Sequence, residues 1–460
     1  MLRPSPGTTA LSLALSALSL IAAACASTPE RDAGASAPSP DPTTTDEVVA
    51  ATRAASPTPR EDATPESAGG AADALHWELL IDGLDVPNDL ADIGDGRLLV
   101  SDQTGLIHMV TDEGTGDEPV LDLTDRIMAP TRSNQELGLS GFTLHPQFAT
   151  NRLLYVFYTA APEDDTDGVR RVDVLAEFTA AADEPLRVEP DSERELMRTE
   201  QAGMAHVGGH MAFADDGMLY VGMGDSGRPA EAADPHTMQG TIIRIDVDGD
   251  DGYAVPADNP FADGRDGAPE VFAYGFRNPF RLAWDDTVGL LVAEPQWQEK
   301  HQEVHVAVSG GDHGYPATPR QVPDGSCFDR APEPLPECLT GPEGEPLQPP
   351  VLDYDRTVGN IVSGVAVSRG DGVPGLGGAV VVADWGGTLL AATPGSEGEQ
   401  WETHVLEAEF ADGPAASSDG RFTGYVWALD ADASGAVYAM TTSRSFAAGE
   451  GAVYRLSVSD

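Results

Sequence analysis

Residues 205–227 read AHVGGHMAFADDGMLYVGMGDSG, and the pattern around Gly217 indicates the class of fold. A turn with aspartate and glycine precedes a short, alternating apolar segment, and a second turn follows at Asp225. Alternation with a period of two is typical of a β-strand with one buried face. The stretch therefore predicts a short, half-buried strand between two turns.

The same pattern returns five more times, separated by connections of very uneven length. The other copies are GDGRLLVSD (94–102), TNRLLYVFYT (150–159), TVGLLVAEP (287–295), LGGAVVVADWGG (376–387) and ASGAVYAMT (433–441). Six copies predict an all-β, six-bladed β-propeller. A β-sandwich with coincidental turns is the alternative, but uneven loops are expected where they build a site on one propeller face. The final segment GAVYRLSV (451–458) is predicted to pair with an early strand, which closes the ring and removes exposed edges.

The composition agrees with many short strands and limits the possible partners. The chain has 460 residues with 50 Gly and 36 Pro, an excess that favours turns over long helices. Its net charge is −50, from 26 basic and 76 acidic residues. Nucleic acid is therefore excluded as a partner, since binding requires basic side chains that neutralise phosphates.

The N-terminal segment has the composition of an export signal. Arg3 precedes the apolar run LSLALSALSLIAAA and then Cys25, and the last four residues, AAAC, resemble a bacterial lipobox. We predict a lipoprotein signal peptide over 1–25 with lipid on Cys25; an ordinary signal with an incidental cysteine is the alternative. Residues 26–74 are rich in Ser, Thr, Pro, Ala and acidic residues, which predicts a disordered tether. The folded domain is predicted over 75–460, exported and lipid-anchored, in the periplasm or at the cell surface, with no other contact to the membrane.

Two further cysteines lie close together in the segment CFDRAPEPLPEC, at Cys327 and Cys338. Export to an oxidising compartment favours a disulfide between them. A metal site is the alternative, but no histidine or further cysteine nearby completes a set of ligands.

His206 and Asp225 are the first candidates for catalysis. His206 precedes two glycines, a strand, a turn and a second strand, and a hairpin of this length returns Asp225 close to His206. An imidazole held by a carboxylate is a good general base. A structural histidine is the alternative, but the adjacent glycines allow the backbone to approach a ligand closely.

A second candidate segment is PEVFAYGFRNPFRLAWD (269–285). Arg277 and Asn278 interrupt its aromatic strand pair, and this combination suits a planar polar ligand. A structural arginine that satisfies loop carbonyls is the alternative. The segment RIDVDGDDGY (244–253) is interpreted as an aspartate-rich turn, because Asp251 stands where an EF-hand requires glycine.

Five segments in order resemble the glucose/sorbosone dehydrogenase family, which includes soluble quinoprotein glucose dehydrogenases and aldose sugar dehydrogenases. They are ELGLSGFTLHPQFATNRLLYVFYT (136–159), HVGGHMAFADDGMLYVGMGDSG (206–227), GTIIRIDVDGDDGYAVPADNPF (240–261), PEVFAYGFRNPFRLAWD (269–285) and EVHVAVSGGDHGYP (303–316). The resemblance implies a six-bladed propeller that binds pyrroloquinoline quinone with calcium. It also implies oxidation of the anomeric hydroxyl of aldose sugars, with electrons passed to an acceptor that the sequence does not identify. A non-catalytic propeller that binds a carbohydrate or a protein is the alternative.

The resemblance also implies roles for single residues. His206 matches the family's catalytic base, Asp225 the carboxylate that orients it, and Arg277 with Asn278 the pair that contacts the quinone. Arg277 would also stabilise negative charge on the quinone oxygen. Glu136 falls where members carry Gln or Glu near the cofactor.

The remaining matches concern charge and calcium. Gln296 and Trp297 fall where two backbone carbonyls ligate the calcium. The family's Arg-x-Arg pair is reduced to Arg421 with Thr423, the family's lysine is absent around Trp385, and His210 stands where arginine is common. Losing two cations is expected to weaken the binding of a tricarboxylate, because each charge-assisted hydrogen bond contributes about 1.5–3 kcal/mol.

Overall fold

A computed structural model describes the chain from Leu75 to Ser459, with several gaps. The described ranges are 75–94, 96–111, 114–116, 118–130, 135–163, 168–182, 186–249, 252–296, 301–315, 347–370, 372–395, 400–410, 412–417 and 420–459. All of them belong to one compact unit, Asp62–Asp460. The predicted signal peptide, tether and disulfide, and with them Cys25, Cys327 and Cys338, lie outside the described residues and stay predictions.

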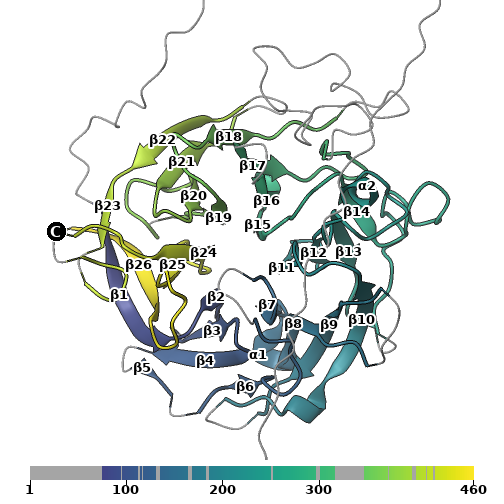
Figure 1. Cartoon of the computed structure of the whole chain (residues 1–460), viewed down its shortest axis with the longest axis horizontal. Helices are drawn as coiled ribbons and strands as arrows, with labels where there is room; N and C mark the ends of the chain where they lie inside the picture. The colour runs from purple at the N-terminus through teal and green to yellow at the C-terminus, as the bar shows by residue number, and fades with distance from the viewer. Residues whose placement is uncertain are drawn as a thin grey trace, which may run out of the picture. The chain divides into compact units, whose positions relative to one another are not determined.

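The strands form six sheets arranged in a ring, which confirms the predicted six-bladed β-propeller (Figure 1). Each sheet is given from its axial strand outward, and the first blade contains β2 (Pro87–Asp92), β3 (Leu98–Asp102), β4 (Leu106–Thr111) and β5 (Gly114–Thr115), with β6 (Leu121–Asp122) also on β4. The second blade contains β7 (Leu139–Leu144), β8 (Leu153–Ala160), β9 (Arg171–Thr179) and β10 (Arg194–Gln201), and the third contains β11 (Gly208–Phe213), β12 (Leu219–Met223), β13 (Thr241–Ile245) and β14 (Val271–Tyr274). The fourth blade contains β15 (Arg281–Asp285), β16 (Gly289–Gln296), β17 (His301–Val306) and β18 (Leu352–Asp355), the fifth β19 (Val362–Val367), β20 (Val380–Asp384), β21 (Leu389–Thr393) and β22 (Glu402–Leu406), and the last β24 (Tyr425–Ala431), β25 (Val437–Thr442), β26 (Gly451–Val458), β1 (Leu75–Leu84) and β23 (Ala408–Phe410). The axial strands β2, β7, β11, β15, β19 and β24 each contact the next around the centre.

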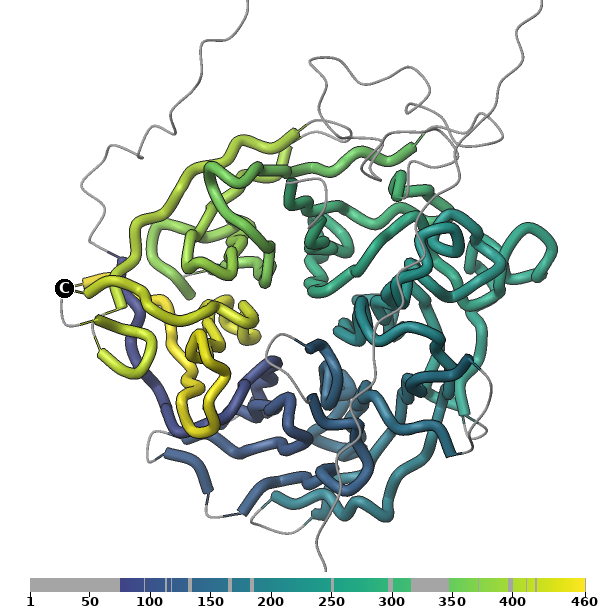
Figure 2. The backbone as a smooth tube through the Cα atoms, in the orientation of Figure 1, coloured from purple at the N-terminus to yellow at the C-terminus, as the bar shows by residue number. Residues whose placement is uncertain are grey.

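Both ends of the described chain meet in the last blade, as predicted. Strand β1 pairs antiparallel with β26 from Leu75↔Val458 to Leu84↔Gly451. In Figure 2 the purple N-terminal strand runs along the yellow C-terminal blade. This pairing joins both ends of the described chain in one sheet and so closes the ring.

Each repeated sequence pattern forms the second strand of a blade. The six copies become β3, β8, β12, β16, β20 and β25. The prediction that these strands are half buried was wrong, since β3, β12, β20 and β25 are buried at every position. The reason is tertiary, because neighbouring blades cover both faces of each sheet.

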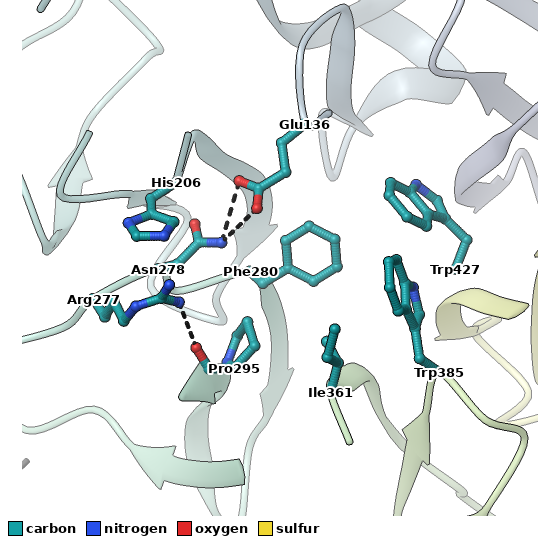
Figure 3. A pocket seen from close by; sticks show the side chains of 9 residues that line it. All are labelled: Glu136, His206, Arg277, Asn278, Phe280, Pro295, Ile361, Trp385 and Trp427. Atoms are coloured by element: carbon teal, nitrogen blue, oxygen red, sulfur yellow. Dashed lines mark hydrogen bonds between the residues drawn. The ribbon is translucent and has the colours of Figure 1, made fainter. Parts of the chain in front are cut away.

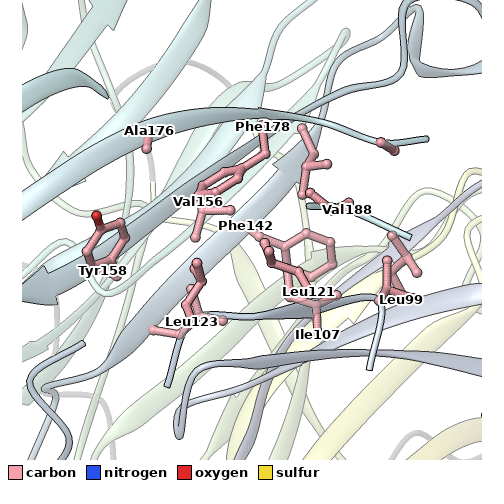
Figure 4. Close-up of a cluster of buried hydrophobic side chains, with 14 of the residues drawn as sticks. Leu99, Ile107, Leu121, Leu123, Phe142, Val156, Tyr158, Ala176, Phe178 and Val188 are labelled. Carbon is pink, nitrogen blue, oxygen red and sulfur yellow. The ribbon is translucent and has the colours of Figure 1, made fainter. Parts of the chain in front are cut away.

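The hydrophobic core consists of six clusters, one between each pair of neighbouring blades. Figure 4 shows the cluster between the first two blades, where Ile107 of β4 lies near Phe142 of β7 and Val156 of β8. Because the apolar side chains pack between the blades, the residues around the axis can be polar. These groups form the site described below.

Helices are few and short among the described residues. They are α1 (Phe148–Asn151), the 3₁₀ turn η1 (Pro190–Ser192) and α2 (Pro229–Ala232). None of them has the length or the apolar character needed to cross a bilayer.

Candidate active site

A pocket opens where the axial strands begin. It encloses roughly 630 Å³, part of which is open to solvent. Its lining comes from five blades, and the residues are Glu136, His206, Arg277, Asn278, Phe280, Pro295, Ile361, Trp385 and Trp427 (Figure 3). The structure therefore brings together four of the site residues predicted from sequence: Glu136, His206, Arg277 and Asn278.

His206 and Asp225 form the predicted pair. Nδ1 of His206 lies 2.5 Å from Oδ1 of Asp225, and the backbone N–H of Gly227 donates to the same oxygen at 2.7 Å. Asp225 is fully buried, and its own N–H donates to the carbonyl of Arg277 at 2.9 Å. The carboxylate of Asp225 accepts a hydrogen bond from Nδ1–H of His206, so the neutral imidazole carries its lone pair on Nε2.

The backbone at this pair is strained. His206 has φ of 53° and Ser226 has φ of 55°, in the left-handed region that side chains rarely adopt. Gly224 makes the close approach possible, because a Cβ there would lie 2.0 Å from the carbonyl oxygen of His206. Strain of this kind costs about 1–3 kcal/mol per residue and concentrates at functional sites.

The polar wall of the pocket is built by hydrogen bonds between blades. Asn278 donates from Nδ2 to both oxygens of Glu136 at 3.2 Å and accepts the N–H of Gly208 at 3.1 Å. Glu136 also accepts the N–H of Val207 at 2.8 Å. Asn278 and Glu136 therefore hold the loop that carries His206, which gives both a structural reason to be polar.

Arg277 keeps most of its donors free. Its guanidinium donates through NH1 to the carbonyl of Pro295 at 2.8 Å, and no other acceptor contacts it in the described part of the chain. A guanidinium has five N–H donors. The side chain is only 7% exposed, so the unused donors are available to a ligand in the pocket rather than to bulk water.

The opposite wall is aromatic and was not recognised from sequence. Trp385 and Trp427 lie 5.5 Å apart between ring centres, and Trp385 stacks on Tyr425 at 4.6 Å. Trp385 stands in the region where the family carries a lysine. The sequence signal was the pair of tryptophans at the second strand of one blade and the axial strand of the next, which meet only when the blades pack.

A buried acidic network lies behind Arg277. Glu294 accepts the backbone N–H of Arg277, and Gln296 donates to Glu294 at 2.8 Å and to Glu303 at 3.3 Å. Burial, together with the nearby charge of Glu303, raises the pKa of Glu294 well above its ordinary value. Gln296 is 1% exposed and does not line the pocket. Trp297 lies outside the described residues, so the calcium carbonyls stay a prediction.

The two basic side chains Arg421 and His210 lie outside the pocket of His206. Arg421 is exposed and lines a separate cavity with Ser417, Phe422, Thr423 and Arg444, so the structure does not bring it to the pocket of His206. His210 lines a different cavity, formed by the C-terminal parts of the axial strands. Neither side chain compensates within the pocket for the missing lysine.

His210 belongs to an axial cluster with Asp89 and Asp430, whose oxygen and nitrogen atoms lie within 4.8 Å of one another. Nδ1 of His210 accepts the N–H of Leu282 at 3.1 Å, so the proton of the neutral ring is on Nε2, which faces Asp89 at 3.4 Å. A metal ligand needs a free lone pair at that nitrogen. The hydrogen bonding therefore favours a proton-sharing cluster over a metal site.

The two carboxyl groups of this cluster differ in charge. Burial, together with the adjacent Asp89, raises the pKa of Asp430 well above its ordinary value. Burial alone would raise the pKa of Asp89 too, but His210 and the fully buried Arg281 lower it. Asp430 is therefore the acid that donates a hydrogen bond to the Asp89 carboxylate.

We expect Asp430→Asn to remove part of the pH dependence of stability. The folded state raises the pKa of Asp430, so its contribution is present below the ordinary carboxyl pKa and is lost as pH rises through the folded value. Over that interval the wild type should lose up to about 1.4 kcal/mol per pH unit from this group. Asparagine keeps a donor for Asp89 and does not titrate.

Urea unfolding at a series of pH values between 4 and 9 measures this, as the difference in free energy of unfolding between variant and wild type. The difference should grow in favour of the variant as pH rises. Parallel curves for the two proteins would contradict the assignment of the proton to Asp430.

The family comparison agrees with this geometry. The family model described as Glucose / Sorbosone dehydrogenase matches residues 84–438, which include five whole blades and the axial strand of the sixth. The chain belongs to the glucose/sorbosone dehydrogenase family.

The individual proteins that this chain resembles are distant from it. Hedgehog-interacting protein of Mus musculus is 26% identical over 380 residues, which is 80% of this chain and 50% of that protein. Quinoprotein glucose dehydrogenase B of Acinetobacter calcoaceticus is 25% identical over 260 residues, 52% of each chain. The PQQ-bound aldose sugar dehydrogenase of Streptomyces coelicolor superposes with a TM-score of 0.61 at 22% identity, covering 86% of this chain and 100% of the other. The chain thus spans about half the length of these two curated relatives, and the solved structure supports the fold.

Proposed function

We propose that this protein is a quinoprotein sugar oxidoreductase that oxidises the anomeric hydroxyl of aldoses. One observation carries the proposal: His206, paired with the buried Asp225, faces a pocket that also contains the Arg277 guanidinium with unused donors. A proton acceptor next to a cationic donor group is the arrangement needed to deprotonate a hydroxyl while negative charge develops nearby.

The pocket fits a planar cofactor with carbonyl acceptors. Its two walls differ, since Trp385 and Trp427 form an aromatic side and Arg277 with Asn278 a polar side. An aromatic surface suits a flat ring, and the free donors of Arg277 suit an oxygen at its edge. Pyrroloquinoline quinone is such a molecule, and the named Acinetobacter relative is a quinoprotein.

The residues of the chain have distinct roles in this proposal. Asp225 holds the His206 ring so that the Nε2 lone pair receives the proton of the sugar hydroxyl. Arg277 binds the edge of the cofactor and stabilises negative charge there. Asn278 and Glu136 hold the loop of His206. The cofactor, when bound, accepts the two electrons of the oxidation.

Calcium is part of the proposal through Gln296 and Trp297, whose backbone carbonyls would ligate it. Arg421 would contact the cofactor only if the quinone reached the separate cavity that this side chain lines. Among the described residues the pocket offers a tricarboxylate one guanidinium and one imidazole, next to the carboxylate of Glu136. Affinity for the quinone is therefore the first quantity to measure.

The test is reconstitution of the purified protein with pyrroloquinoline quinone and calcium, followed by absorbance spectroscopy and isothermal titration. We expect a bound-cofactor spectrum that aldoses reduce, and turnover with an artificial electron acceptor. Binding without reduction by any aldose in a broad panel would refute the sugar oxidoreductase.

A non-catalytic binding role is the second candidate. It is favoured by the similarity to Hedgehog-interacting protein over 80% of this chain and by the absence of Arg421 from the pocket. Failure of the wild-type protein to bind the quinone at all would favour this role. The ligand would then be a carbohydrate or a protein that contacts the pocket face.

We also propose that the protein is exported and anchored by lipid on Cys25, with residues 26–74 as a tether. The signal composition and the AAAC sequence support this. Mass spectrometry of the mature N-terminus after expression in a bacterial host should find a diacylglyceryl cysteine, and processing should be sensitive to globomycin. A mature chain that starts at another residue without lipid would contradict the anchor.

A further inference from the structure

Tyr315 contacts the candidate base pair from a neighbouring blade. It lies on the loop after β17, is 7% exposed, and its hydroxyl donates to Oδ2 of Asp225 at 3.2 Å. The other oxygen of Asp225 accepts from His206 and from the N–H of Gly227. Each oxygen of this fully buried carboxylate therefore has its own donor. Of these donors, Tyr315 is the one that comes from a different blade.

The loop that carries Tyr315 is fixed to the segment that carries Arg277. The N–H of Tyr315 donates to the carbonyl of Gly275 at 2.9 Å, and the N–H of His313 donates to that of Tyr274 at 2.8 Å. Gly275 has φ of 81°, and a Cβ there would lie 2.3 Å from Oδ1 of Asp312. The loop is therefore docked two residues before Arg277, which limits the positions open to the Tyr315 ring.

We infer that Tyr315 is a positioning residue for His206, acting through Asp225. With both oxygens held, the carboxylate plane has one orientation, and the imidazole is kept in the tautomer that turns its Nε2 lone pair to the pocket. The effect on turnover rests on the proposed function, whereas the effect on the His206 ring does not.

Loss of the Tyr315 hydroxyl should change the protonation of His206 in one direction only. A hydroxyl that donates to a carboxylate disperses part of its charge. Without that donor, Asp225 attracts the protons of the His206 ring more strongly, and the protonated ring persists to higher pH. Removing the hydroxyl should therefore shift the acid limb of the kcat/KM profile to higher pH, and a role in packing alone would not.

Tyr315→Phe removes the hydroxyl and keeps the ring. In protein without cofactor, we expect the pH midpoint of the His206 imidazole signal in NMR to rise by about 0.3–1 pH unit. With quinone, calcium and an aldose, kcat should fall by about 3- to 10-fold. The acid limb of kcat/KM should move in the same direction as the NMR midpoint.

Tyr438→Phe is the matched control, since Tyr438 is 5% exposed and its hydroxyl contacts Asp432 at 2.7 Å, at the end of β24. It should leave the His206 midpoint unchanged. An unchanged midpoint in Tyr315→Phe overturns the inference, whatever the activity. A shifted midpoint in a protein that oxidises no sugar sustains the inference and refutes the proposed function instead. A double variant with Asp225→Asn should show no further shift from the loss of the hydroxyl.

Discussion

We expect His206→Ala to lower kcat for aldose oxidation by about 10²- to 10⁴-fold, the usual cost of removing a general base. The side chain receives the proton of the sugar hydroxyl in the proposed function, and alanine offers no acceptor in its place. The fold should be retained, because His206 precedes β11 and contributes no apolar side chain to the clusters between blades. The measurement is steady-state kinetics on reconstituted protein with several aldoses.

His236→Ala is the control for this variant. His236 also pairs with an aspartate, with Nδ1 3.0 Å from Asp234, but it is exposed and lies away from the pocket lining. It should retain wild-type turnover. If His206→Ala and His236→Ala are equally active, His206 is not the base. Affinity for the quinone, measured by titration, should be nearly the same in both.

We expect Arg277→Ala to differ in kind, because it affects both binding and turnover. Loss of a charge-assisted hydrogen bond of about 1.5–3 kcal/mol should weaken quinone binding by roughly 10- to 150-fold. Turnover at saturating cofactor should fall by about 10²- to 10³-fold, as for the removal of a donor that stabilises developing charge. Isothermal titration gives the first quantity and kinetics at saturation the second.

Arg277→Lys and Arg369→Ala sharpen this test. Lysine retains the charge without the planar fork, so it should recover part of the binding and little of the turnover. Arg369 contacts Asp285 and the carbonyl of Trp284 near the other end of the axial strands, and its loss should change neither quantity. Unchanged cofactor affinity in Arg277→Ala would show that the guanidinium does not contact the quinone.

The six blades could be predicted from the sequence because each blade is a local unit. The turn-and-strand pattern around Gly217 repeats once in every blade, and pairing between consecutive strands needs little information from distant residues. The proximity of Asp225 to His206 could be predicted too, since a hairpin joins them. The full burial of these strands could not be predicted, because the second face of a strand such as β12 is covered only when another blade packs on it.

Part of the candidate site could be predicted from the sequence. The contacts that could not be predicted join residues far apart in the chain. His206, Arg277, Asn278 and Glu136 were recognised by motif, and the ring places them in one pocket. The aromatic wall of Trp385 and Trp427 was not recognised, nor was the separation of Arg421 from the pocket. Each of these depends on how different blades face the axis, which no local pattern records.

The number of blades, the closure of the ring by residues 451–458 and the return of Asp225 to His206 could all be predicted from the sequence. These follow from periodicity and from hairpins, which are local and set by turn chemistry. The packing of the blades determines which charges meet at the axis and which oxygen of Asp225 each donor contacts. Tyr315 lies 90 positions from Asp225 in the chain, and their contact exists because two blades pack side by side and exclude water from the carboxylate between them.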